Sequence, residues 1–189
     1  MNNLLKKSVK EYQKTQDPLY EVQKLSNKIR AKSKEAIAML RRENRKESKK
    51  AIIEAENFFK LINKTVKENR ELKSQGFYKE AVEEYIEAIT FFNFFEKSAM
   101  KVPDFIEVRP NEIISGICDF TGELVRRAIT IASKESFNEL ISYKEATQNV
   151  AKELTKIGFQ GKLRHKYDEV ERNLRRMEGI LYDIKLKKQ

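Results

Sequence analysis

The chain has 189 residues, of which 40% are hydrophobic and 36% charged, and its formal net charge is +10. Eleven Phe and seven Tyr exclude a disordered chain, and the length favours one domain, residues 1–189. Six Gly and three Pro are too few for the turns of many short strands, so long helices are expected.

Apolar residues recur at helical spacing along most of the chain. From Leu19 they predict a first amphipathic helix with lysines on its outer face. Residues 1–17 precede this pattern and are interpreted as an N-terminal extension that is free to be flexible. The charged run at 41–50 separates the first helix from a second long one, which ends before Gly76.

The remaining helices follow from the same spacing and from the positions of Pro and Gly. They are Phe77 to about Met100, a buried helix that begins at Pro110, and the patterns at 137–157 and 163–186, the last two split by GFQG at 158–161. No strand and no internal repeat is expected. The sequence therefore predicts an all-α, single-domain bundle of about six or seven long helices.

Positive charge is concentrated at the two ends of the chain. Residues 1–50 carry fifteen Lys/Arg against six Asp/Glu, and residues 161–189 carry nine against five. Such a surface favours nucleic acid or an anionic membrane as partner, although the same composition also serves solubility. The side chains expected to contact nucleic acid are Lys28, Lys32 and Arg42 near one end and Arg164, His165, Lys166, Arg172, Arg175 and Arg176 near the other.

Cysteine usage and hydropathy bear on the compartment. Cys118 is the single cysteine and lies in an apolar stretch, where a core position is expected. The N-terminal residues lack the apolar run of a signal peptide, and no stretch approaches the roughly 18 apolar residues of a membrane span. A soluble, cytoplasmic protein with no membrane partner is expected.

Carboxylates interrupt the two most apolar predicted helices. Glu84 and Glu87, three residues apart, project from one side of the segment AVEEYIEAITFFNFF, and Asp119 and Glu123 are four apart in the following helix. Buried carboxylates are costly unless cations or hydrogen-bond donors compensate them. If the two helices pack side by side, four carboxylates converge, and ligands of this kind suit Mg²⁺ or Mn²⁺ and phosphodiester hydrolysis.

Other interpretations of these acids remain open. They can form internal ion pairs, since Arg126 and Arg127 lie within one turn of Glu123. The EExxE pattern at 83–87 resembles half of the metal motif of all-α nucleoside-triphosphate pyrophosphatases, although D-x-x-x-E stands here in place of E-x-x-D. His165 is the only histidine, which argues against a ferritin-like di-iron site. No phosphate loop or Cys/His zinc cluster is present.

Four segments resemble the translin and translin-associated factor X family, and the resemblance runs from about residue 19 to 186. They are LSNKIRAKSKEAIAMLRR at 25–42, EEYIEAITFFNFF at 83–95, RPNEIISGICDFTGELVRR at 109–127 and LRHKYDEVERNLRRMEGILYDIK at 163–185. The second and third are similar to the nuclease-bearing factor X branch, and the last is similar to translin itself. The resemblance implies an all-α bundle of about seven helices.

The resemblance also implies a function. The factor X branch places metal-binding catalytic acids at positions that match Glu84, Glu87 and Asp119, with Glu123 as a further matching acid, whereas translin proper lacks the complete set. Family members form octameric shells around single-stranded RNA or DNA. We therefore expect a Mg²⁺- or Mn²⁺-dependent endoribonuclease that cleaves single-stranded RNA within a homo-oligomer, an octamer if it follows the family. The alternatives are a non-catalytic single-strand-binding shell and a nucleoside-triphosphate pyrophosphatase.

Overall fold

The computed structural model describes residues 2–132 and 137–187, and within these ranges it contains helices and no strand. The elements are α1 (Asn2–Arg41), α2 (Arg45–Glu68), the 3₁₀ turn η1 (Arg70–Ser74), α3 (Gly76–Glu96), α4 (Pro110–Ile131), α5 (Phe137–Leu154) and α6 (Gly161–Lys187). The predicted all-α class and the expected number of long helices are confirmed. None of these helices is both long and apolar enough to cross a membrane.

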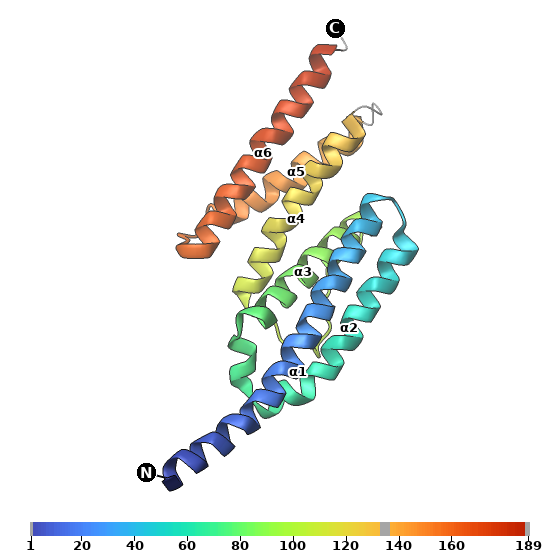
Figure 1. Ribbon diagram of the computed structural model, residues 1–189. Helices are drawn as coiled ribbons and strands as arrows, with labels where there is room; N and C mark the ends of the chain where they lie inside the picture. The colour runs from blue at the N-terminus through green and yellow to red at the C-terminus, as the bar shows by residue number, and fades with distance from the viewer. Residues whose placement is uncertain (1, 133–136, 188–189) are drawn as a thin grey trace.

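The helices pack in an order that follows the chain (Figure 1). α1 and α2 form a helical hairpin, α3 packs against α1, α4 packs against α3, and α5 and α6 cover α4 at the other end of the molecule. Ion pairs join Arg30 to Glu80 and Lys34 to Glu84, so α1 and α3 run in the same direction. This shared direction places one continuous face of α1 beside the acidic face of α3.

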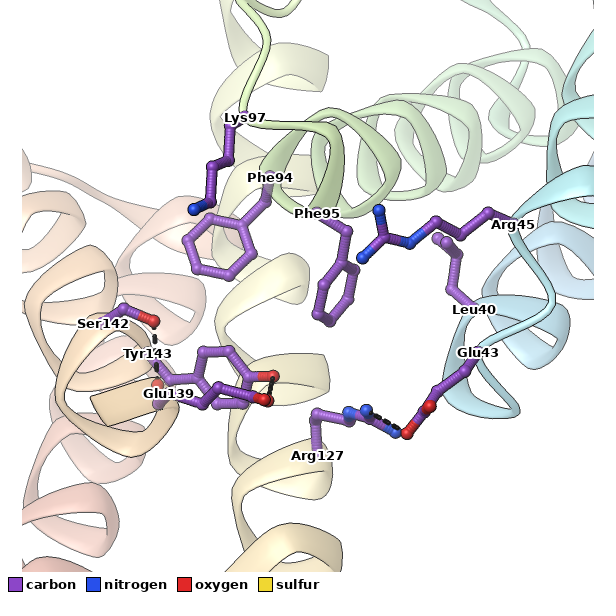
Figure 2. Close-up of a pocket in the computed structure, with 10 residues that line it drawn as sticks. All are labelled: Leu40, Glu43, Arg45, Phe94, Phe95, Lys97, Arg127, Glu139, Ser142 and Tyr143. Carbon is purple, nitrogen blue, oxygen red and sulfur yellow. Dashed lines mark hydrogen bonds and ion pairs between the residues drawn. The ribbon is translucent and has the colours of Figure 1, made fainter. Parts of the chain in front are cut away.

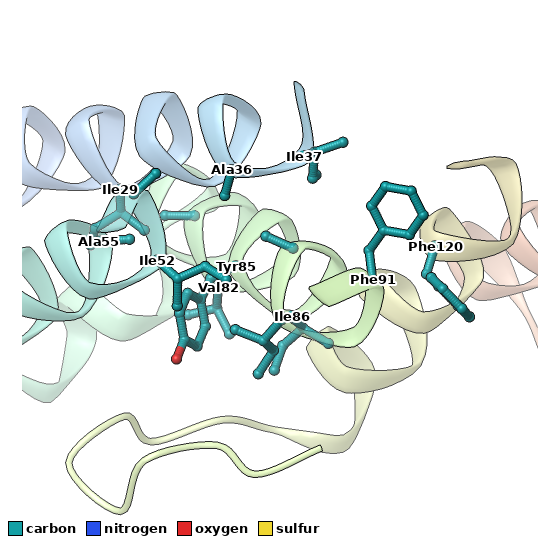
Figure 3. Close-up of a cluster of buried hydrophobic side chains, with 14 of the residues drawn as sticks. Ile29, Ala36, Ile37, Ile52, Ala55, Val82, Tyr85, Ile86, Phe91 and Phe120 are labelled. Atoms are coloured by element: carbon teal, nitrogen blue, oxygen red, sulfur yellow. The ribbon is translucent and has the colours of Figure 1, made fainter. Parts of the chain in front are cut away.

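A single large apolar core joins the first four helices (Figure 3). Side chains of α1 such as Ile29 and Ile37 meet Ile52 of α2 and Ile86 of α3, and all four are buried. A smaller cluster on the other side of α4 surrounds Cys118, whose predicted core position is confirmed. Burial raises the pKa of the Cys118 thiol to about 12, so this side chain stays protonated and is not a nucleophile at neutral pH.

The first turns of α1 extend beyond the bundle (Figure 1). Residues 2–17, expected as an extension, continue α1 as helix, and their flexibility stays a prediction. Leu5, Val9 and Tyr12 have exposed fractions of 61%, 47% and 64% and repeat at spacings of four and three. They share one side of these first turns, about a third of a turn around the helix from the stripe of Val22 and Ile29 that is buried further along α1.

α3 and α4 approach each other closely at a glycine. A Cβ added at Gly116 would lie 2.6 Å from the carbonyl oxygen of Glu83 and 2.7 Å from Cβ of Ile86, which is shorter than any normal contact. Only glycine therefore allows this separation of the two helices. The same contact fixes their register, so that Glu87, one turn after Glu83, comes opposite Asp119.

Gly116→Ala is therefore expected to lower the free energy of unfolding by about 1–3 kcal/mol, because the helices must separate to admit the methyl group. Gly122→Ala on the same helix is the matched control, since the nearest atom to its added Cβ is Nδ2 of Asn173 at 3.8 Å. That variant should be neutral or slightly stabilised. Urea denaturation measures both, and equal midpoints would contradict the close contact.

Candidate active site

The four acids predicted from the sequence lie on facing sides of α3 and α4. Glu84 and Glu87 come from α3, and Asp119 and Glu123 from α4. Their mutual effect is visible at Glu87: burial, followed by the negative charges of Asp119, Glu123 and Glu84, raises the pKa of this carboxyl group to about 8. Packing of α3 against α4 therefore places these four residues in one acidic cluster, and their roles as metal ligands and catalytic groups stay a prediction.

Cations of α1 lie on one side of this acidic cluster. Nε and Nη2 of Arg41 donate to the two carboxylate oxygens of Glu123, each at 2.6 Å, which is a bidentate pair. Nζ of Lys34 lies 3.3 Å from Oε1 of Glu84. Arg126, considered from the sequence as a partner of Glu123, is a weaker one, with its Nε at 3.7 Å.

Cations of α6 lie on the other side of the acidic cluster. Lys166 donates to Asp119, and the two side chains are 20% and 25% exposed, so this predicted nucleic-acid contact is largely buried against the acidic cluster. Nζ of Lys162 lies 2.7 and 2.6 Å from the two carboxylate oxygens of Glu83. Glu83, the first acid of the EExxE pattern, is therefore bound to α6, while Glu84 beside it is bound to α1.

Glu87 differs from the other three acids because it takes part in no ion pair among the described residues. Its partial burial and the charges of Asp119, Glu123 and Glu84 raise its pKa, and the positive charge of Lys166 opposes them only in part. A divalent cation would supply the missing positive charge, and carboxylate oxygens are the ligands that Mg²⁺ and Mn²⁺ prefer. The donor set therefore fits such an ion.

Ion pairs hold most of the acidic cluster in this structure. As the side chains stand, no three His, Cys, Asp or Glu residues in the described ranges are grouped closely enough to hold a metal ion. Three of the four carboxylates are instead held by Arg41, Lys34 and Lys166. Metal coordination would require Lys34 and Lys166 to release their carboxylates.

The basic residues expected on α1 have different surroundings. Nζ of Lys28 lies 5.2 Å from the centre of the Phe58 ring, and Lys32 is bound to Glu54 at 2.7 Å as well as to an acid of its own helix. Arg42, at the end of α1, is exposed. The charge of Lys32 is therefore neutralised by acids. Arg42 is more accessible to solvent than Lys32.

The basic residues expected on α6 form a row along that helix. His165 and Arg176 are exposed. Three arginines lie 3.1 to 4.0 Å from acids of the same helix: Arg164 from Asp168, Arg172 from Glu169, and Arg175 from Glu171. These pairs are at the surface, where they contribute little and are easily exchanged for phosphate.

Sequence reasoning missed the two cations of α1 that hold the acids. Lys34 and Arg41 are seven residues apart and therefore lie on one face of a helix, next to the buried stripe that includes Ile37. That spacing was a usable signal. It did not identify their partners, because those are 50 and 82 positions away in the sequence.

Comparison with known proteins agrees with this architecture. A model of the Translin family matches residues 20–188. The Translin-associated protein X homolog of Schizosaccharomyces pombe is 26% identical over 189 aligned positions, which span 90% of this chain and 82% of that protein.

Solved structures share the fold at lower identity. Apo-NeC3PO superposes with a TM-score of 0.83 at 22% identity and covers 95% of this chain and 96% of its own. AfC3PO in complex with duplex RNA gives a TM-score of 0.84 at 20% identity and covers 97% of each chain. Because the family model matches most of the sequence, the chain belongs to the Translin family.

Proposed function

We propose that the chain is a Mg²⁺- or Mn²⁺-dependent endoribonuclease that cleaves single-stranded RNA. The observation that carries the proposal is Glu87, a half-buried carboxyl group without an ion-pair partner among the described residues, close enough to three other carboxylates for their charges to raise its pKa. Relatives support RNA as the substrate class, since AfC3PO has been solved with duplex RNA and the S. pombe relative is a translin-associated protein X homolog.

The acids of the cluster and their cation partners have different roles in this proposal. Glu84, Glu87 and Asp119 would hold the ion, which when bound supplies an activated water and neutralises charge on the phosphate. Glu123 is kept in one orientation by the bidentate contact with Arg41 and serves as a fourth ligand or orients water. Once released from their carboxylates, Lys34 and Lys166 are placed to contact the phosphates on either side.

The test is incubation of the purified protein with labelled single-stranded RNA, and separately duplex RNA, in Mg²⁺, Mn²⁺ or EDTA. We expect cleavage of the single strand that requires the metal. Intact RNA that still migrates more slowly on a gel would instead support a non-catalytic binding shell, for which the ion pair of Arg41 with Glu123 is a specific argument. Hydrolysis of a free nucleoside triphosphate with no effect on RNA would support a pyrophosphatase.

We also propose that copies of this chain associate into a closed homo-oligomer in the cytoplasm, with the octamer of the family as the expected size. Support comes from the exposed apolar stripe of Leu5, Val9 and Tyr12, which is suited to a second copy. A cytoplasmic location is supported by the free thiol of Cys118, which suits a reducing compartment.

Replacing Leu5, Val9 and Tyr12 together by Ser should therefore lower the molar mass measured by light scattering after gel filtration. The matched control replaces both Lys6 and Lys10 by Ser. This changes the same segment of α1 without removing its apolar side chains. It should keep the wild-type mass. A wild-type mass in the apolar triple variant would exclude this segment from the interface.

A further inference from the structure

A cavity lies at the end of α3, where this helix meets α4, α5 and the turn between α1 and α2 (Figure 2). Its volume is about 580 Å³, which is within the range of small-molecule sites. Three aromatic and three cationic side chains line it, together with two acids. They are Phe94, Phe95, Tyr143, Arg45, Lys97, Arg127, Glu43 and Glu139.

The aromatic side chains form one surface of this cavity (Figure 2). The centre of the Phe94 ring lies 5.7 Å from that of Phe95 and 5.7 Å from that of Tyr143. Both phenylalanines are only half-buried, although they end a helix whose other apolar residues are mostly buried. Partly exposed rings at a cavity are a platform on which a flat ring can stack.

The cationic side chains differ in how far they are compensated. Arg127 is buried; its Nη2 donates to Glu43 at 2.6 Å, but its Nε is buried without an acceptor among the described residues. Arg45 reaches Glu96 at 3.3 Å, and both of those side chains are exposed. Lys97 takes part in no ion pair of the described residues. Lys97 therefore offers positive charge to an anion, while the carboxylate of Glu139, which accepts from the Tyr143 hydroxyl at 3.1 Å, belongs to the same lining.

Backbone conformation singles out the same place. Within the described ranges, Glu43 and Lys97 are the only residues other than glycine with positive φ, at 63° and 51°, and both line this cavity. Glycine is preferred in this conformation, and a side chain there costs on the order of 1 kcal/mol. Both residues follow helix ends, where this conformation is common, with Lys97 as the C-cap of α3, so the two tight turns fix where these side chains meet the cavity.

The cavity lies next to the acidic cluster. Arg127 follows Glu123 by one turn of α4, about 6 Å along the helix axis. Phe94 follows Glu87 by about two turns of α3, or about 10 Å. Arg41 joins the two sites, since its guanidinium binds Glu123 and its carbonyl oxygen accepts from Nη1 of Arg127 at 3.2 Å. The separation is close to the length of one nucleotide.

We propose that this cavity binds one nucleotide of the RNA strand, next to the bond that is cleaved. The base stacks on Phe94 and Phe95, and the phosphate is held by Lys97 and Arg45. This inference rests on the proposed nuclease function for the identity of the strand. The shared chemistry is that of a nucleoside monophosphate, which combines a flat ring with negative charge.

The test is calorimetric titration of AMP and of UMP into the full-length protein in EDTA, where no cleavage occurs. We expect binding by the wild type and a loss of about tenfold or more in Phe94→Leu and in Lys97→Gly, as expected when a stacking or charged contact is removed. Lys97→Gly should fold at least as stably as the wild type, because glycine suits positive φ. Lys101→Gly, in the exposed segment that follows, is the matched control and should bind normally.

Retardation of a short RNA in EDTA and inhibition of cleavage by AMP separate the sources of the ligand. If the cavity holds a nucleotide of the strand, Lys97→Gly weakens RNA retardation and AMP competes with RNA. Absence of AMP and UMP binding at millimolar concentration, or equal binding by Lys97→Gly, would overturn the proposal. AMP binding without competition would also overturn it and assign the cavity to a free nucleotide. Absence of cleavage with these binding results intact would contradict the nuclease function alone.

Discussion

Asp119→Asn is expected to reduce RNA cleavage by about 10³-fold or more while RNA affinity stays within a few-fold of the wild type. Asp119 faces Glu87, and its charge contributes to the raised pKa of that residue. The amide of Asn has nearly the same shape as the carboxylate of Asp119. The packing around it should therefore be kept while the site loses a metal ligand. Single-turnover cleavage and gel retardation with the same RNA measure the two effects separately.

Glu83→Gln is the matched control for Asp119→Asn. Glu83 is also a largely buried acid that is bound to a lysine of α6, with side-chain exposure of 13% against 25% for Asp119. The Glu83→Gln variant should cleave RNA at the wild-type rate. Equal loss of cleavage and RNA affinity in Asp119→Asn would show that this residue acts through structure or charge. Loss of activity in Glu83→Gln would point instead to the EExxE motif of the pyrophosphatases.

Glu87→Gln is expected to abolish cleavage and, in EDTA at alkaline pH, to stabilise the protein. Burial and neighbouring carboxylates raise the pKa of Glu87 from 4.5 to about 8 in the folded state. The folded protein therefore binds this proton more tightly than the unfolded chain does. Its contribution to stability is complete below pH 4.5 and is lost as the pH rises to about 8.

The neutral amide avoids that loss. At pH 9 in EDTA the free energy of unfolding of Glu87→Gln should exceed that of the wild type by on the order of 1–4 kcal/mol, at about 1.4 kcal/mol per pKa unit. Near pH 4.5 the two should be alike. Urea denaturation across this pH range measures the difference, with Glu145→Gln on the exposed face of α5 as control. A variant that is less stable at pH 9 would mean that the Glu87 carboxylate is compensated in the folded protein.

Much of the fold follows from local rules that a sequence exposes. Pro110 at the start of α4 and the apolar spacing of α3 determine element type almost by themselves. The helical form of residues 2–17 was harder to predict, because this segment combines lysines with few apolar residues and its described side chains are mostly exposed. Its helical form depends on propensity and on continuity with the later part of α1.

The acids of the site were predictable because carboxylates on an apolar helix are costly to bury unless cations or hydrogen-bond donors compensate them. Their partners were not, because Arg41, Lys34 and Lys166 reach them through packing between distant segments. Arg127 shows the difficulty: its distance of four residues from Glu123 suggested an ion pair, but its side chain is bound to Glu43. The cavity beside it required tertiary structure, since its lining comes from four separate stretches of chain.

The central claim is that Glu84, Glu87 and Asp119 hold a divalent cation. Anomalous diffraction from crystals of the wild-type protein soaked in Mn²⁺ tests it most directly. We expect an anomalous peak about 2.0–2.2 Å from carboxylate oxygens of these three residues, with Lys166 displaced from Asp119, and no peak there in crystals of Glu87→Gln. Saturating Mn²⁺ that gives no peak between α3 and α4, in protein that cleaves RNA in Mn²⁺, would contradict the account.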